Sequence, residues 1–124
     1  MNTIAWLFLI AALLPIVAAG IAKAGGAKFD NNDPRAWLSK QDGYRARANA
    51  AQTNLFEGLP FFYAAVLFAL FNQIDLDLLR NLMIGWIVLR LAYIGCYVAD
   101  TGGLRSLVWA ASLAVNAYIL FAAI

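Results

Sequence analysis

The chain has 124 residues, of which 64% are hydrophobic and only 13% are charged. Soluble domains carry about 25% charged residues, so this composition excludes an ordinary soluble globular protein and predicts an integral membrane protein. The formal net charge of +2 comes from basic residues crowded into one connection, which indicates membrane topology rather than nucleic-acid binding.

The residue types that are missing narrow the possible chemistry further. Histidine is absent, which excludes a Ser-His-Asp triad and the commonest zinc sites. Cys96 is the single cysteine, so no intramolecular disulfide can form. We expect no metal site, and any catalysis has to rely on Arg, Tyr, Glu, Ser or a bound ligand.

Four stretches are apolar and long enough to cross a bilayer as helices, for which about 20 residues suffice. They cover residues of about 3–22, 43–71, 76–99 and 104–123. Gly58 and Pro60 predict a bend in the second stretch. Residues 28–43 form the only long polar connection, and their Asp-Asn-Asn-Asp-Pro run predicts a loop. We therefore predict one all-α domain over residues 1–124, an integral membrane four-helix bundle.

Charged residues at the helix ends predict both helix starts and orientation. Asp42 is suited to cap the second helix, and Asp75 and Asp77 suit the positive N-terminal end of the third. The first connection is strongly basic, the second carries only acidic charge, and Arg105 adjoins the third. The positive-inside rule then places the first and third connections in the cytoplasm and both termini outside. We expect a multi-pass protein of a bacterial inner membrane.

The second predicted helix carries polar residues into the membrane. Arg47, Asn54 and Glu57 are spaced i, i+7 and i+10, which places them on one helical face. Glu57 lies ten positions past Arg47, about 15 Å along its helix. Arg90 lies nine positions before Ala99, about 14 Å along the third helix from the same side of the membrane. Because unpaired charges at membrane depth are costly, we predict a contact between Glu57 and Arg90, within one subunit or between two.

The last two predicted helices carry polar faces of their own. Arg90, Tyr93 and Tyr97 share a face of the third helix. Several arginines with one glutamate suit a mostly anionic, zwitterionic ligand, for which glutathione, a lipid headgroup and a nucleotide all qualify. The face predicted on the fourth helix contains Arg105, Trp109, Ser112 and Asn116. The cytoplasm-facing pocket predicted between the last three helices contains Arg47, Asn54, Glu57, Arg90, Tyr93, Tyr97 and Arg105.

Three local patterns resemble one known family. The second helix carries R-x3-A-x2-N-x2-E, from Arg47 to Glu57, followed by Leu-Pro-Phe. The third has Arg90 and Tyr97 seven residues apart, and the fourth begins with the pair Arg105-Ser106. Together with the chain length, the helix count and the long basic first connection, these patterns resemble the MAPEG superfamily, the membrane-associated proteins of eicosanoid and glutathione metabolism.

The resemblance implies a homotrimer in which glutathione binds between subunits near the cytoplasmic side. It implies that Arg105 stabilises the glutathione thiolate and that Ser106 donates a hydrogen bond, while a hydrophobic electrophile arrives through the membrane lipids. The implied activity is that of a glutathione-dependent transferase or peroxidase. The residues assigned to binding or ordering glutathione are Arg47, Asn54, Glu57, Arg90, Tyr93 and Tyr97.

The sequence also has features of two other classes of membrane protein, a non-catalytic binding protein and a small multidrug exporter. Thr53 and Gln52 stand where glutathione-using members often carry a basic residue and a histidine. A non-catalytic membrane protein that binds a lipid or an anionic ligand in the same pocket is therefore the alternative. A small multidrug exporter has a similar size but relies on a glutamate in its first helix, and the first predicted helix here carries no charge.

Overall fold

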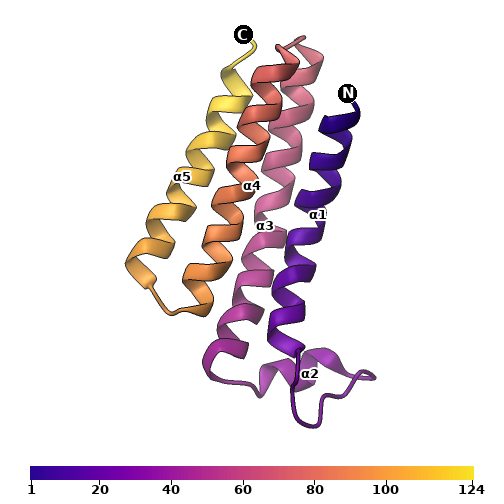
Figure 1. The fold of residues 1–124 in the computed structure, drawn as a ribbon, viewed down its shortest axis with the longest axis vertical. Helices are drawn as coiled ribbons and strands as arrows, with labels where there is room; N and C mark the ends of the chain where they lie inside the picture. The colour runs from indigo at the N-terminus through magenta and orange to yellow at the C-terminus, as the bar shows by residue number, and fades with distance from the viewer.

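The computed structural model describes residues 1–124 and contains helices and connections only (Figure 1). Four helices are long and apolar enough to cross a membrane, which confirms the predicted all-α four-helix bundle of an integral membrane protein. A short fifth helix lies in the first connection. The helices are α1 (Asn2–Lys23), α2 (Pro34–Ser39), α3 (Gly43–Phe71), α4 (Leu76–Val98) and α5 (Gly102–Phe121).

The long helices agree closely with the predicted stretches, because each prediction followed an uninterrupted apolar run. α3 contacts all three other long helices and also α2, so it is the central helix of the bundle. α3 continues through Pro60, and α1 continues through Pro15. The largest fully buried side chains include Trp86 and Phe62, whose rings stack at a centroid distance of 3.8 Å.

The helix α2 corrects the prediction of a plain loop in the first connection. Asp33 is its N-cap and accepts a hydrogen bond from the Ala36 amide at 3.3 Å, while Pro34 occupies the first helical turn. An acidic N-cap followed by proline favours a helix start as much as a turn, which is why the Asp-Pro pair misled the prediction. The Trp37 indole then donates to the Ala27 carbonyl at 3.2 Å and ties α2 to the connection that follows α1.

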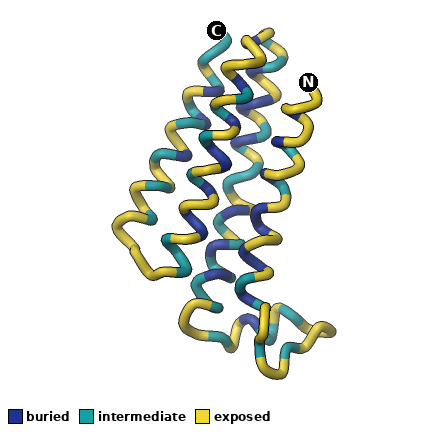
Figure 2. Tube along the Cα trace, viewed as in Figure 1, coloured by how far each residue is buried: buried dark blue, intermediate teal, exposed yellow.

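The outer surface of the bundle is apolar, as a membrane protein requires. Figure 2 shows buried residues where the long helices face one another and exposed residues along their outer sides and in the connections. Trp6, Leu67, Val88 and Leu107 are examples of large apolar side chains that are more than half exposed. Such surface is stable against lipid or against another subunit, but not against water.

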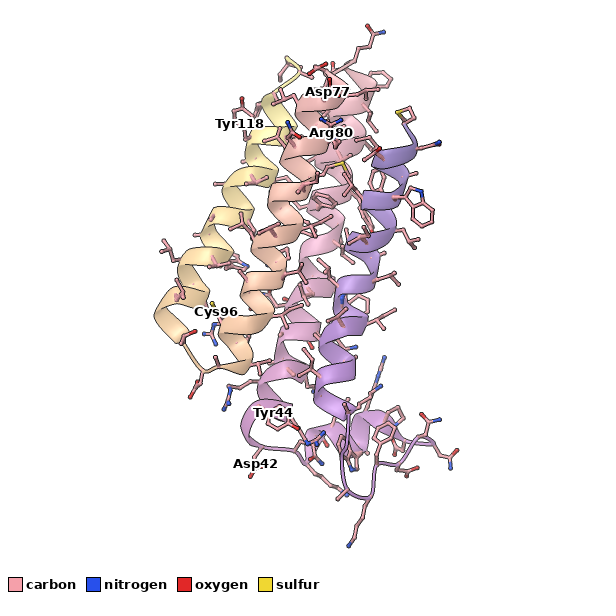
Figure 3. The ribbon with its side chains drawn as sticks, viewed as in Figure 1. Asp42, Tyr44, Asp77, Arg80, Cys96 and Tyr118 are labelled. Carbon is pink, nitrogen blue, oxygen red and sulfur yellow. The ribbon has the colours of Figure 1, made fainter.

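The two ends of the bundle differ in charge. Both termini and the α3–α4 turn lie at one end, while α2 and the long first connection lie at the other (Figure 1). At the first end, Arg80 pairs with Asp77 at 3.1 Å, and Asp75 accepts from the Leu78 amide at 3.1 Å. At the opposite end Asp42 is the N-cap residue of α3, as predicted, but its side chain makes no capping hydrogen bond (Figure 3).

Candidate functional site

A buried guanidinium lies at the centre of the polar residues. Arg90 of α4 is only 2% exposed. Its Nη2 atom donates to the Asn54 side-chain oxygen at 2.9 Å and to the Asn54 backbone carbonyl at 3.2 Å. A charge at membrane depth requires such partners, and these two bonds also join α3 to α4.

Gly58 makes room for this guanidinium. A Cβ atom at Gly58 would lie 3.3 Å from Arg90 Nη2 and 3.7 Å from its Cζ. The absence of a side chain at this position therefore lets Arg90 lie against the α3 backbone, one turn beyond Asn54.

The predicted ion pair between Glu57 and Arg90 does not form within the subunit. The only ion pair within 4.0 Å joins Arg80 and Asp77. Glu57 is exposed on α3, whereas Asn54 supplies the oxygens that Arg90 binds. Their depths match, but the Glu57 side chain does not approach Arg90 closely enough to pair. A contact between Glu57 and Arg90 of two different subunits stays a prediction.

Two tyrosines connect Arg90 to Arg105. The Arg90 guanidinium lies 4.7 Å from the Tyr93 ring centroid, and Tyr93 packs edge-on against Tyr97 at 5.7 Å. Arg105 of α5 lies 4.3 Å from the Tyr97 ring centroid. This confirms the predicted shared face of Arg90, Tyr93 and Tyr97. The two edge-on rings hold both guanidiniums through cation–π contacts.

Arg47 occupies a different position from the other predicted residues. Its Nε and Nη2 atoms both donate to the Val98 carbonyl, at 3.2 and 3.0 Å. Arg47 therefore satisfies a carbonyl at the C-terminal end of α4 that has no partner within the helix. It borders none of the three cavities of the protein. This contact suits the predicted role of ordering the site, and its direct binding to a ligand stays a prediction.

Two neighbouring cavities lie between α3, α4 and α5. The first, which we call the arginine cavity, has a volume of about 250 Å³. The second, the inner cavity, has a volume of about 180 Å³ and shares Asn54 and Trp109 with the first. The arginine cavity is lined by Asn54, Tyr93, Arg105, Ser106 and Trp109. The inner cavity is lined by Asn54, Glu57, Gly58, Phe61, Trp86, Arg90, Trp109, Ser112, Leu113 and Asn116.

These linings show which site residues the sequence analysis found and which it missed. The predicted face of α5 is confirmed, because each of its four residues borders at least one of these cavities. Arg105 borders the arginine cavity, Ser112 and Asn116 border the inner cavity, and Trp109 borders both. Trp109, Ser112 and Asn116 were not included in the predicted pocket, although their helical spacing from Arg105 could have indicated that they belong to it. The other lining residues missed are Gly58, Phe61, Trp86 and Leu113.

A third cavity, the α2 cavity, lies between the end of α1, α2 and α3. It has a volume of about 510 Å³ and contains the cations Lys23 and Arg35. Glu57 of α3 borders both the α2 cavity and the inner cavity, so it lies between the two.

The arrangement favours the binding of an anion. No carboxylate lies within 4.0 Å of Arg47, Arg90 or Arg105. No cluster of three or more histidine, cysteine or acidic side chains is present that could hold a metal ion. The chemistry that this site can supply is therefore charge stabilisation by guanidinium groups and hydrogen bonding by hydroxyl and amide groups.

Comparison with known proteins identifies the family. No curated protein and no solved structure matches the chain. Residues 3–124, nearly its whole length, match the model of the MAPEG family. The family match agrees with the resemblance of the three sequence patterns, and the four apolar helices agree with a membrane protein. The chain therefore belongs to the MAPEG family.

Proposed function

We propose that the protein is a membrane-bound, glutathione-dependent transferase or peroxidase that acts on hydrophobic electrophiles. The observation that carries this proposal is the pair of neighbouring cavities, one bordered by Arg90 and the other by Arg105. Neither arginine has a carboxylate partner within 4.0 Å. Membership of the MAPEG family supports the same function.

Arg105 and Ser106 would act on the glutathione sulfur. Both border the arginine cavity, and Arg105 is held against Tyr97. A guanidinium beside a thiol favours the thiolate, which is the nucleophilic form. Ser106 would donate a hydrogen bond to the same sulfur. The thiolate then attacks an electrophilic carbon and displaces its leaving group, or attacks a hydroperoxide oxygen. The second reaction oxidises glutathione to its sulfenic acid and releases an alkoxide, which takes up a proton from water to become the alcohol; a second glutathione thiol then forms the disulfide and releases water.

The remaining polar residues would hold the peptide portion of glutathione. Its two carboxylates suit the guanidinium groups, and its ammonium suits the Glu57 carboxylate. Asn54, Arg90, Tyr93 and Tyr97 would complete the binding surface, with Arg47 ordering the end of α4.

The glutathione site would be completed by a second subunit of a homotrimer. Glu57 is exposed and borders two cavities on either side of α3, which is a position that a neighbouring subunit can cover. The exposed apolar faces of the bundle would be divided between subunit contacts and lipid, through which the electrophile arrives. The site would face the cytoplasm of a bacterial cell, with both termini on the other side of the inner membrane.

Equilibrium binding of glutathione to the purified protein tests this function. We expect saturable binding at millimolar glutathione. Arg105→Ala should reduce the thiolate absorbance of the bound complex, and Glu57→Gln should weaken binding about tenfold, since hydrogen bonds to charged groups contribute about 1.5–3 kcal/mol. Arg80→Ala removes an arginine at the far end of the bundle and serves as the matched control.

The same experiment separates the enzyme from a non-catalytic alternative. In the alternative, the same polar pocket binds a lipid or another anion, which the unpaired Arg90 and Arg105 would also favour. No saturable binding at millimolar glutathione would contradict the transferase or peroxidase function. Binding of anionic lipid that depends on Arg105 but not on Arg80 would then support the alternative.

A further inference from the structure

The α2 cavity contains two cations without acidic partners. Lys23 ends α1 and Arg35 belongs to α2, and both line this cavity. No carboxylate lies within 4.0 Å of either. Ammonium and guanidinium groups, together with hydroxyl and amide groups, are common partners of phosphate oxygens. The hydroxyl and amide side chains in the same lining are Ser39, Asn49, Gln52 and Thr53.

The wall of the cavity that contains Arg35 is held in place by Trp37. The Phe29 ring packs edge-on against Trp37 at a centroid distance of 5.0 Å. The Arg45 guanidinium of α3 lies 6.0 Å from the Trp37 ring centroid and also donates to the Ala22 carbonyl at 3.0 Å. α2 is therefore fastened to the connection that precedes it and to α3, so the cavity has fixed walls.

The cationic part of the cavity lies at the depth of lipid phosphates. Ala22, Leu38 and Ala48 pack together, which places the end of α1 and α2 level with the second turn of α3. Ala48 lies about 8 Å along α3 from its first residue. α3 has 29 residues and is about 44 Å long, whereas the hydrocarbon core of a bilayer is about 30 Å thick. About 7 Å of α3 therefore remains for the headgroup layer at each end.

An exposed apolar side chain lies deeper in the same lining. Phe56 borders the cavity and is 51% exposed. It lies eight residues past Ala48, about 12 Å deeper along α3 and inside the hydrocarbon core. Glu57, the only carboxylate in the lining, lies at a similar depth and is therefore distant from the cationic part. The cavity thus suits a ligand with an anion at headgroup depth and an apolar chain below it.

We propose that the α2 cavity binds an anionic phospholipid of the membrane. Lys23 and Arg35 would hold the phosphate, the hydroxyl and amide side chains would bind the other headgroup oxygens, and an acyl chain would run along Phe56. Basic pockets at the end of membrane helices favour anionic lipids in this way. A choline headgroup would add a quaternary ammonium beside the two cations and would be disfavoured.

This lipid site is separate from the proposed glutathione chemistry. It uses neither Arg90 nor Arg105, which border the other two cavities. It also differs from the non-catalytic alternative, in which a lipid would occupy the pocket of those two arginines. Its volume of about 510 Å³ lies within the range of about 300–1,000 Å³ that is usual for ligand pockets.

Native mass spectrometry of the delipidated protein in detergent tests the site with three probes. They are dioleoyl phosphatidylglycerol, dioleoyl phosphatidylcholine and glycerophosphoglycerol, which is the first headgroup without acyl chains. We expect a single phosphatidylglycerol per subunit, bound at least about tenfold more tightly than either other probe. Equal binding of phosphatidylcholine, equal binding of the free headgroup as at a site for soluble anions, or no saturable binding would overturn the proposal.

Two double variants with the same loss of charge test the location. Lys23→Ala with Arg35→Ala should weaken phosphatidylglycerol binding at least about tenfold. Lys28→Ala with Lys40→Ala removes two exposed cations of the same connection that line no cavity, and should change binding by less than about twofold because such charges are screened. Arg105→Ala should leave lipid binding unchanged.

Equal weakening by both double variants would overturn the assignment, because a general attraction between the basic connection and anionic lipid would explain it. Weakening by Arg105→Ala alone would place the lipid in the arginine cavity and would also overturn it. If the variant without Lys23 and Arg35 fails to fold, the comparison of the three probes on the unaltered protein still decides the proposal.

Discussion

At the scale of single residues, Arg90 shows how the bundle accommodates a charge at membrane depth. Its guanidinium donates to two oxygens of Asn54 and lies over the ring of Tyr93. No carboxylate lies within 4.0 Å of it. Gly58 leaves the space in which this guanidinium lies. The electrostatic character of the site therefore depends on a residue without a side chain as much as on the charged residue itself.

Gly58→Ala should destabilise the protein, although glycine-to-alanine changes within helices usually stabilise by about 0.5–1 kcal/mol. The added methyl group would lie 3.3 Å from Arg90 Nη2, and overpacking of this kind costs about 1–3 kcal/mol. Thermal unfolding in detergent measures the effect as a lower midpoint.

Gly85→Ala in α4 is the matched control for this change. A Cβ atom at Gly85 has no neighbour within 4 Å, so the substitution should raise the midpoint or leave it unchanged. Equal stabilisation by both substitutions would show that Arg90 does not need the space at Gly58.

At the scale of elements, the starts of the helices differ in how they are secured. Asp75 caps α4 through its carboxylate, and Asp33 does the same for α2. Asp42 occupies the corresponding position before α3 without making such a bond. Residue type alone therefore does not determine whether a cap forms, because the carboxylate also needs a favourable backbone and side-chain geometry.

Asp75→Ala should lower the free energy of unfolding by about 1 kcal/mol, the usual contribution of an acidic N-cap. Asp42→Ala should change it much less, because no capping hydrogen bond is lost. Unfolding of the two variants in parallel, under the same detergent conditions, measures the difference. A larger loss in Asp42→Ala than in Asp75→Ala would contradict the assignment of the caps.

At the scale of the whole molecule, the two ends of the bundle are chemically distinct. The end that contains α2 and the long first connection is basic, and the end that contains both termini carries Asp77 paired with Arg80. Figure 3 shows Asp42 and Tyr44 at the first end and Asp77, Arg80 and Tyr118 at the second. The arginine cavity is bordered by Arg105 and Ser106 at the start of α5, which lies toward the basic end (Figure 1).

Labelling of single cysteines tests the proposed orientation. In a Cys96→Ser background, Asn31→Cys lies in the exposed first connection and Ile124→Cys at the exposed C-terminus. A membrane-impermeant maleimide added to intact cells should label Ile124→Cys alone, because positively charged connections stay in the cytoplasm. Both should react after permeabilisation, and labelling of Asn31→Cys alone in intact cells would contradict the orientation.

The sequence alone predicts the class of the protein, the positions of its four long helices and the polar faces of α4 and α5. Those properties are local, because an apolar run of about 20 residues sets a membrane span and the 3.6-residue period sets which residues share a face. The face of α5 that contains Arg105 and Asn116 was predictable for this reason. The three patterns that resemble the MAPEG family are also local in sequence, so they can be recognised without knowledge of the fold.

Which residues meet across helices depends on how the helices pack, and the sequence did not reveal it. Periodicity gives the depth of Arg90 and Glu57 but not how each helix turns toward its neighbour, so the acceptor within the subunit proved to be Asn54. For the same reason, the sequence analysis did not include Gly58 and Trp86 in the site. The inner cavity exists because residues of α3, α4 and α5 leave the same space unfilled.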